Sequence, residues 1–208
     1  MSIKARPFAN LEQLHEAVFA LLKENLQQES ASPRAMLLSG GNTPLPIYRR
    51  IAESPFPVAP SAFIAFTDDR HVPAADPASN FGQTRAMLSA LGMESNQTLR
   101  VDPEVPLEES ARKYHDTLAD FVRGGGVFPL GLLGLGSDGH TCSLFEERHL
   151  DTPPEVLAVP IEKDTPPHRV SVTVPLLKQI EENEFLVAGE SKREVVEALL
   201  NQPESLVA

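Results

Sequence analysis

Short apolar runs that each end in a polar or glycine-rich cluster, followed by a segment with helical spacing, constrain the fold of this chain most. Such runs occupy residues 35–40, 62–70, 127–136 and 184–190, and a further apolar run spans 169–175. Near-continuous apolar strands separated by amphipathic helices are typical of a parallel sheet that is covered on both faces. The sequence therefore predicts a Rossmann-like α/β fold, with a mostly parallel sheet and helices on both faces, in three layers.

The segments between these runs have the apolar spacing of amphipathic helices. The predicted helices are the segment after Asn10 and residues 44–51, 81–91, 107–121, 175–182 and 191–200. Asn10 with Gln13, and Ser191 with Glu194, resemble the residue pairs that cap helix starts. Strands and helices alternate throughout, and we expect one α/β domain over residues 1–208.

The composition limits what the protein can be. Its residues are 41% hydrophobic and 23% charged, as in ordinary globular proteins. No apolar run approaches the ~20 residues that a transmembrane helix needs, so we expect no membrane span. The first residues, MSIKARPFANLEQ, lack the apolar stretch of a secretory signal, and we therefore expect a cytoplasmic protein.

Charge and cysteine content exclude further classes. The net charge of −11 argues against binding to nucleic acid, because such binding needs a basic surface. An anionic ligand would instead need a few local cations. The single cysteine, Cys142, excludes an internal disulfide and a cysteine-based metal cluster.

Polar clusters follow the predicted strands. Ligands of parallel α/β sheets bind beyond the carboxyl ends of the strands, so we expect these clusters to form one site. The clusters are Ser39-Gly40-Gly41-Asn42-Thr43, Thr67-Asp68-Asp69-Arg70, Gly136-Ser137-Asp138-Gly139-His140-Thr141 and Gly189-Glu190-Ser191-Lys192. His168 and Arg169 lie at the start of a strand instead, and this predicts that they lie on the opposite side of the sheet.

The first two clusters suit anion binding. Residues 39–43 lie between a strand and a helix, where glycine allows close backbone approach and the amides of the first helical turn attract a phosphate. An ordinary capped turn explains these residues equally well. Arg70 can clamp a phosphate and Asp68 can orient a sugar hydroxyl or move a proton, with a salt-bridged turn as the alternative. Lys192 suits either an anion or solvent.

Residues 136–141 carry the strongest indication of chemistry. Asp138 can fix the tautomer or orientation of His140, and histidine is the side chain that most often serves as a general base near neutral pH. A structural loop with a satisfied histidine is the alternative. A metal site made of Asp138, His140 and His149 lacks a second cluster of ligands. We interpret Cys142 as a small buried residue at a helix start rather than as a nucleophile.

Four motifs resemble those of the glucosamine-6-phosphate isomerase/6-phosphogluconolactonase family: LSGGNTP, FTDDRHVPAADPASNFG, LLGLGSDGHTCSLF and VAGESKRE, in this order. The resemblance implies a Rossmann-like parallel sheet. It also implies hydrolysis of 6-phospho-D-glucono-1,5-lactone to 6-phospho-D-gluconate, a step of the oxidative pentose phosphate pathway. The implied partner is a small sugar phosphate, with no metal and no organic cofactor, and we expect a monomer or a homodimer.

The resemblance also assigns roles by position. His140 would be the general base that takes a proton from water, and Asp138 would orient it. Glycine amides of the loops would stabilise the oxyanion that forms on the lactone. The residues that would contact the substrate or its phosphate are Ser39, Gly40, Gly41, Asn42, Thr43, Asp68, Arg70, Gly139 and Lys192.

Several residues depart from the family pattern, among them Thr67 in place of glycine and Cys142 in place of alanine, and two other activities stay open. Asp69 stands where glutamate is usual, so its carboxylate reaches about one methylene less far, and Glu146 stands where proline is usual. A sugar-phosphate isomerase or deaminase acting on glucosamine 6-phosphate has a similar histidine motif. A non-catalytic sugar-phosphate-binding protein is the other alternative, although a pure binder needs no titrating base.

Overall fold

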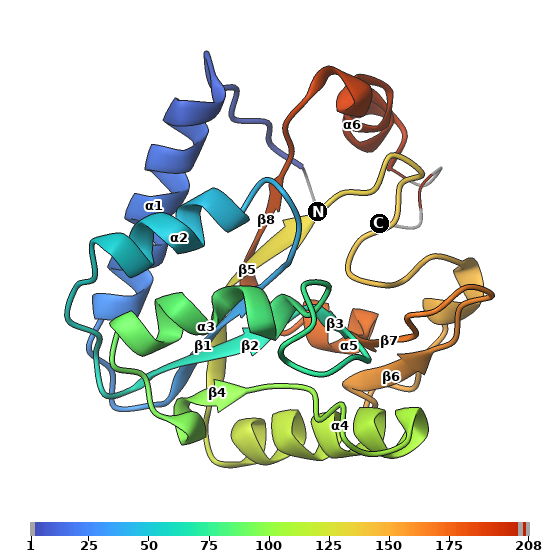
Figure 1. Cartoon of the computed structure of the whole chain (residues 1–208). Helices are drawn as coiled ribbons and strands as arrows, with labels where there is room; N and C mark the ends of the chain where they lie inside the picture. Colours follow the sequence, from blue (N-terminus) through green and yellow to red (C-terminus); the bar gives the residue numbers. More distant parts are fainter. Residues whose placement is uncertain (1–2, 204–205, 207–208) are drawn as a thin grey trace.

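The computed structural model describes residues 3–203 and residue 206, and its centre is a five-stranded sheet in the order β4-β2-β1-β5-β8. Every pairing in this sheet is parallel. Its strands are β1 (Arg34–Leu38), β2 (Ala62–Phe66), β4 (Thr98–Leu99), β5 (Val127–Gly134) and β8 (Ile180–Leu186). The predicted parallel α/β sheet is confirmed (Figure 1).

Helices cover both faces of the sheet. They are α1 (Leu11–Gln27), α2 (Leu45–Glu53), α3 (Asn80–Ala90), α4 (Leu107–Arg123), α5 (Val174–Leu177) and α6 (Arg193–Asn201), with short 3-10 turns η1 (Ser95–Gln97), η2 (Glu147–His149) and η3 (Glu190–Lys192). One apolar cluster joins the sheet to α1, α2 and α3, and a second joins its other face to α4. Figure 1 shows α4 across the sheet from α1 and α2. In the part of the chain that the structure describes, no helix combines the length and apolar character that crossing a bilayer requires.

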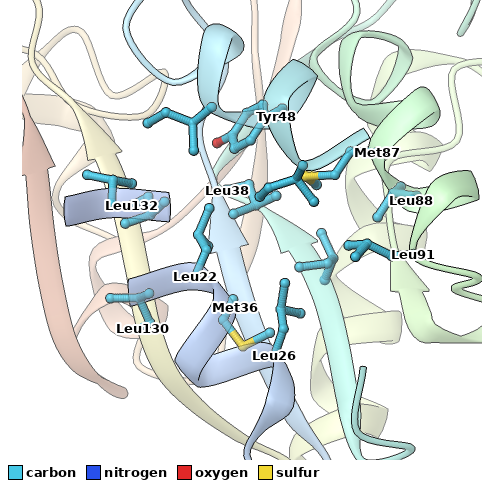
Figure 2. Packing of buried hydrophobic residues seen from close by; sticks show 14 of the residues in the cluster. Leu22, Leu26, Met36, Leu38, Tyr48, Met87, Leu88, Leu91, Leu130 and Leu132 are labelled. Carbon is cyan, nitrogen blue, oxygen red and sulfur yellow. The ribbon is translucent and has the colours of Figure 1, made fainter. Parts of the chain in front are cut away.

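The central strand β1 shows why the sheet needs both layers. Met36 and Leu38 point into the cluster under α1 and α2, whereas Ala35 and Leu37 point toward α4. All four side chains are fully buried, as a strand with period-2 alternation between two covered faces requires. Figure 2 shows Met36 and Leu38 packed with Leu22, Leu26 and neighbouring side chains.

A second, smaller sheet was not predicted. It is antiparallel, in the order β3-β7-β6, and consists of β3 (Asp68–Arg70), β7 (Arg169–Val172) and β6 (Ala158–Ile161). Its register pairs Arg70 with Arg169. The prediction that Arg169 and His168 lie on the opposite side is therefore wrong, because β7 runs antiparallel to β3 and its first residue meets the last residue of β3.

The two predicted helix caps have different outcomes. The cap of α1 is confirmed, since Asn10 Oδ1 accepts the N–H of Gln13 at 2.9 Å. The capping pair of Ser191 and Glu194 does not form, because a 3-10 turn precedes α6 and no side chain caps that helix.

The helix predicted over residues 175–182 is too long, because α5 ends at Leu177 and β8 begins at Ile180. Glu181, Glu182 and Asn183 lie exposed on this strand at the edge of the five-stranded sheet. Charged side chains are common on edge strands, where they discourage pairing with another chain. Pairing with β5 thus overrides the helical pattern of these residues.

A tyrosine fixes the point at which β2 ends. Strand β4 is short and pairs only with Ile64 and Ala65, so it does not reach Phe66. The buried hydroxyl of Tyr114 accepts the N–H of Phe66 at 3.0 Å and donates to the Phe66 carbonyl at 2.6 Å. Helix α4 thereby supplies the backbone partners that a longer β4 would provide, directly before the acidic segment.

Tyr114→Phe should destabilise the protein because it leaves both polar backbone groups of Phe66 buried and unsatisfied. We expect a loss of roughly 1 to 3 kcal/mol for each group in the free energy of unfolding, measured by urea denaturation. Tyr48→Phe is the matched comparison, since the Tyr48 hydroxyl serves only the Ser39 carbonyl, at 2.9 Å. A loss no larger for Tyr114→Phe than for Tyr48→Phe would contradict this role.

Candidate active site

The four predicted clusters all follow neighbouring strands of the parallel sheet. Strands β2, β1, β5 and β8 are adjacent and run in the same direction, so their carboxyl ends lie along one edge (Figure 1). The segments that leave these ends are residues 39–43, 67–70, 135–141 and 187–192. The structure thus places the sequence-predicted residues at one edge of the sheet.

The loop over residues 39–43 is held close to the start of α3. A Cβ atom on Gly40 would lie 1.9 Å from Asn80 Oδ1, so only glycine permits this approach. Gly41 has a φ of +108°, and Gly41 and Asn42 are exposed. Ser39 Oγ is buried without a hydrogen-bond partner among the described residues. An exposed glycine backbone beside an unused hydroxyl suits an oxyanion such as phosphate.

The carboxylate of Asp69 anchors β3 to α3. Its Oδ1 accepts the N–H groups of Arg70 at 2.7 Å and Asn80 at 2.6 Å, and its Oδ2 accepts that of Phe81 at 3.0 Å. Burial raises the pKa of Asp69 to about 6, although these backbone hydrogen bonds act in the opposite direction. The residue that departs from the family pattern therefore has a structural position, buried at a helix start.

Asp68 ties β3 to the loop that follows His140. Its Oδ2 accepts the hydroxyl of Ser143 at 2.7 Å, and its Oδ1 accepts that of Thr67 at 3.1 Å. The amide of Asn80 donates to the Asp68 carbonyl at 2.9 Å. Asp68 is buried, and its contact with a substrate stays a prediction.

Arg70 and Arg169 lie side by side on β3 and β7. Arg70 Nη1 donates to the Ala78 carbonyl at 2.9 Å, whereas Arg70 Nε and the Nε and Nη1 of Arg169 are buried without hydrogen-bond partners in the described chain. Burial and the charge of Arg70 lower the pKa of Arg169. Two neighbouring guanidinium groups with unused donors are a strong site for a carboxylate or phosphate.

Sequence reasoning missed Arg169, but a signal was present. Residues 170–173 read Val-Ser-Val-Thr, which alternates apolar and polar side chains. Such alternation is typical of antiparallel strands, whereas the strands of the parallel sheet are nearly continuous in apolar residues. The pattern therefore distinguishes β7 from the strands of the main sheet.

Asp138 and His140 form the pair that their spacing predicted. His140 Nδ1–H donates to Asp138 Oδ1 at 2.5 Å, because a carboxylate can only accept. This leaves a lone pair on His140 Nε2, which no described residue hydrogen-bonds. Burial by itself raises the pKa of Asp138, but the hydrogen bond and the charge of His140 outweigh it and lower that pKa. The geometry is that of an oriented imidazole base.

Glycines make room for this pair. A Cβ atom on Gly136 would lie 2.2 Å from His140 Nδ1 and 2.3 Å from Asp138 Oδ1. Gly136 N–H donates to the His140 carbonyl at 2.7 Å, which closes the loop. Gly139 has a φ of +84°, and its N–H donates to the Gly136 carbonyl at 3.2 Å. The two glycines thus determine the shape of the loop that carries His140.

Lys192 joins the end of β8 to this loop. Its Nζ donates to the Leu135 carbonyl at 2.6 Å. An ammonium group has three donors, so this bond leaves two for an anion. Lys192 lies in the 3-10 turn before α6, next to the residues that precede Gly136.

Cys142 does not begin a helix, so the prediction that it lies at a helix start is wrong. It has a φ of +54° in a tight turn that is closed by a bridge between Thr141 and Leu144. Burial raises the pKa of its thiol, so the thiolate that a nucleophile needs is disfavoured. Within residues 3–203 and 206, no three His, Cys, Asp or Glu side chains are grouped to hold a metal ion.

Comparison with known proteins identifies the family of this chain. The model of the family described as glucosamine-6-phosphate isomerases/6-phosphogluconolactonase matches residues 9–207. The chain belongs to this family. The 6-phosphogluconolactonase of Rattus norvegicus is 35% identical over 180 residues, which cover 82% of this chain and 70% of that protein. The 6-phosphogluconolactonase of Homo sapiens is 32% identical over 209 residues, which cover 95% of this chain and 81% of that protein.

Solved structures of the glucosamine-6-phosphate isomerase/6-phosphogluconolactonase family share the fold. The crystal structure of 6-phosphogluconolactonase from Thermotoga maritima has a TM-score of 0.77 and 25% identity, covering 96% of this chain and 89% of that one. The family that the four sequence motifs predicted is therefore confirmed.

Asp69→Asn tests the buried carboxylate through the pH dependence of stability. Folding raises the pKa of Asp69 from 3.8 to about 6. The contribution of Asp69 to the free energy of unfolding is therefore complete at pH values below its unfolded pKa of 3.8, and it is lost as the pH rises through about 6. Asparagine does not titrate. Between pH 4 and pH 7 the wild-type protein should lose roughly 2 to 3 kcal/mol of unfolding free energy relative to the variant. Urea denaturation at both pH values measures this, and a constant difference would contradict it.

Proposed function

We propose that this protein hydrolyses 6-phospho-D-glucono-1,5-lactone to 6-phospho-D-gluconate, with His140 as the general base. The observation that carries the proposal is the His140 imidazole, held by Asp138 through Nδ1 and unpaired at Nε2. It lies at the same edge of the sheet as the unused donors of Arg70 and Arg169. Family relatives named 6-phosphogluconolactonase support the same reaction.

Each proton in the reaction has a carrier. His140 Nε2 takes a proton from water as the water oxygen bonds to the lactone carbonyl carbon, and negative charge develops on the carbonyl oxygen. When this intermediate collapses, the bond to the ring oxygen breaks and the imidazolium donates its proton to that oxygen. The Asp138 carboxylate stabilises the imidazolium between the two steps. The new carboxylic acid then releases a proton to solvent.

The oxyanion needs N–H donors, and the loops differ in what they offer. The Gly139 N–H already donates to Gly136, so it is engaged within its own loop. The loop over residues 39–43 is assigned to the phosphate, so its glycine N–H groups do not also serve the oxyanion. Preorganised donors stabilise charge without reorganising during the reaction.

The phosphate binds at the other end of the site. Arg70 and Arg169 clamp it, the loop over residues 39–43 contributes backbone and hydroxyl donors, and Lys192 adds a third cation. Phosphate binding far from the carbonyl orients the lactone. The binding energy of the phosphate group therefore contributes to catalysis by holding the lactone in position. Arg169 thus joins the residues predicted from the motifs.

The proposed partner is a small sugar phosphate, and no step above uses a metal or an organic cofactor. The net charge of −11 leaves little basic surface for nucleic acid. A cytoplasmic location and a monomeric or homodimeric state stay predictions. Glu146 and Glu147, two acidic residues shortly after His140 that leave the isomerase or deaminase alternative open, are exposed, and Glu146 forms an ion pair with Arg148 at 3.0 Å.

The activity is tested by acid release from freshly prepared 6-phosphogluconolactone near neutral pH, compared with the spontaneous rate. We expect a large acceleration that saturates with substrate. Turnover of glucosamine 6-phosphate with no acceleration of lactone hydrolysis would favour the isomerase or deaminase. Binding of the sugar phosphate without any turnover would favour the non-catalytic binder.

His140→Ala and Arg169→Met should separate catalysis from binding. His140→Ala removes the base, so kcat should fall about 100- to 10,000-fold with little change in KM. Arg169→Met removes a phosphate clamp and should chiefly raise KM. Arg112→Met is the control for the latter, because Arg112 is exposed on α4 and pairs with Asp116. Equal changes in KM for both arginine variants would contradict the assignment of Arg169.

Gly136→Ala should lower kcat because its methyl group collides with the Asp138–His140 pair. Displacing an oriented base by about an ångström can cost on the order of 100-fold in rate. Gly134→Ala is the matched control, since a Cβ atom there meets nothing within 4 Å. Comparable kcat values for the two variants in the acid-release assay would show that the pair does not depend on this glycine.

A further inference from the structure

The imidazole of His140 is packed by a phenylalanine to which the reaction above assigns no role. The ring centroids of His140 and Phe145 are 4.5 Å apart, with the planes tilted by 51°. The His140 side chain is 27% exposed, whereas its hydrogen-bond partner Asp138 is 64% exposed. One hydrogen bond to an exposed carboxylate leaves the imidazole free to turn about that bond. A ring packed against the imidazole restricts this rotation.

A lysine from a distant segment lies over the phenylalanine. Lys163 Nζ is 3.8 Å from the centroid of the Phe145 ring, within cation–π distance. Lys163 belongs to the loop between β6 and β7. Its own N–H donates to His168 Nδ1 at 3.2 Å, and the His168 carbonyl accepts the N–H of His71 at 2.9 Å. The loop that presents this cation is therefore tied to the segment following β3.

Another histidine, His149, fixes the backbone of Phe145. His149 Nδ1 accepts the N–H groups of Phe145 and Glu146, each at 3.2 Å. Both bonds need an unprotonated Nδ1, and burial lowers the pKa of His149, which favours this neutral form. Phe145 is thus held at its backbone by His149 and at its ring by Lys163.

We propose that Phe145, clamped by Lys163 and His149, is a positioning residue that fixes the orientation of the His140 imidazole and so directs Nε2 toward the substrate carbonyl. The inference rests on the proposed function, because the orientation matters only if His140 acts as the base. It assigns roles to side chains that lie beyond the Asp138–His140 pair and touch no reacting atom. Its consequence is that kcat depends on the clamp while substrate binding does not.

The kinetic test compares four variants in the acid-release assay. Phe145→Leu removes the ring and should lower kcat about 10- to 100-fold with KM nearly unchanged, whereas Phe145→Tyr keeps the ring and should retain most of the rate. Lys163→Met should lower kcat a few-fold. The matched control is Lys23→Met, which removes a cation on α1 that lies 5.6 Å from the centroid of the Phe56 ring, and which should leave kcat unchanged.

A spectroscopic test does not depend on activity. The ring current of Phe145 should shift the imidazole proton resonances of His140 in the wild-type NMR spectrum, and Phe145→Leu should move them toward the values of a free histidine. If the wild-type protein shows these shifts but does not hydrolyse the lactone, the proposed function is overturned, whereas the packing of Phe145 on His140 still stands. Unchanged His140 resonances and unchanged kcat in Phe145→Leu would overturn the clamp. A rise in KM equal to the loss in kcat would also overturn it.

Discussion

The buried carboxylate of Asp69 is the interaction on which the rest of the site depends. By accepting the N–H groups of Asn80 and Phe81, it joins β3 to the first turn of α3. Asn80 is thereby set against Gly40 and the Asp68 carbonyl, which positions the phosphate loop. On the other side, β3 pairs with β7 and brings Arg169 to Arg70. The three-residue strand β3 thus connects the parallel sheet to both ends of the proposed substrate site.

Sequence alone predicts the parallel sheet because the pattern that identifies each strand lies within the strand and the residues that follow it. A continuous apolar run followed by glycine and polar residues identifies a buried strand and its carboxyl end, and parallel strands share that end. The pairing of Asp138 with His140 is also local, since only Gly139 separates them. Strand β3 is different: Asp-Asp-Arg has low intrinsic β-propensity. Its carboxylates are satisfied by Asn80, Phe81 and Ser143, which lie far along the chain.

Two residues that the sequence missed are placed by the small antiparallel sheet. Arg169 reaches Arg70 only because β7 pairs with β3 in the opposite direction, and Lys163 reaches Phe145 from the loop before β7. Such placements depend on long-range pairing: the alternation of residues 170–173 is typical of an antiparallel strand, but it does not identify β3 as the partner. The helix predicted over residues 175–182 was too long for the same reason: residues 175–177 are helical, but pairing with β5 decides the conformation of β8.

The central claim is that one edge of the sheet holds the phosphate at Arg70 and Arg169 and the reacting carbon at His140. A crystal structure of the protein with 6-phosphogluconate bound tests it most directly. The account predicts the phosphate between the two guanidinium groups and the loop over residues 39–43, with the C1 carboxylate beside His140 Nε2. A product bound with its phosphate elsewhere, or with C1 remote from His140, would contradict the account.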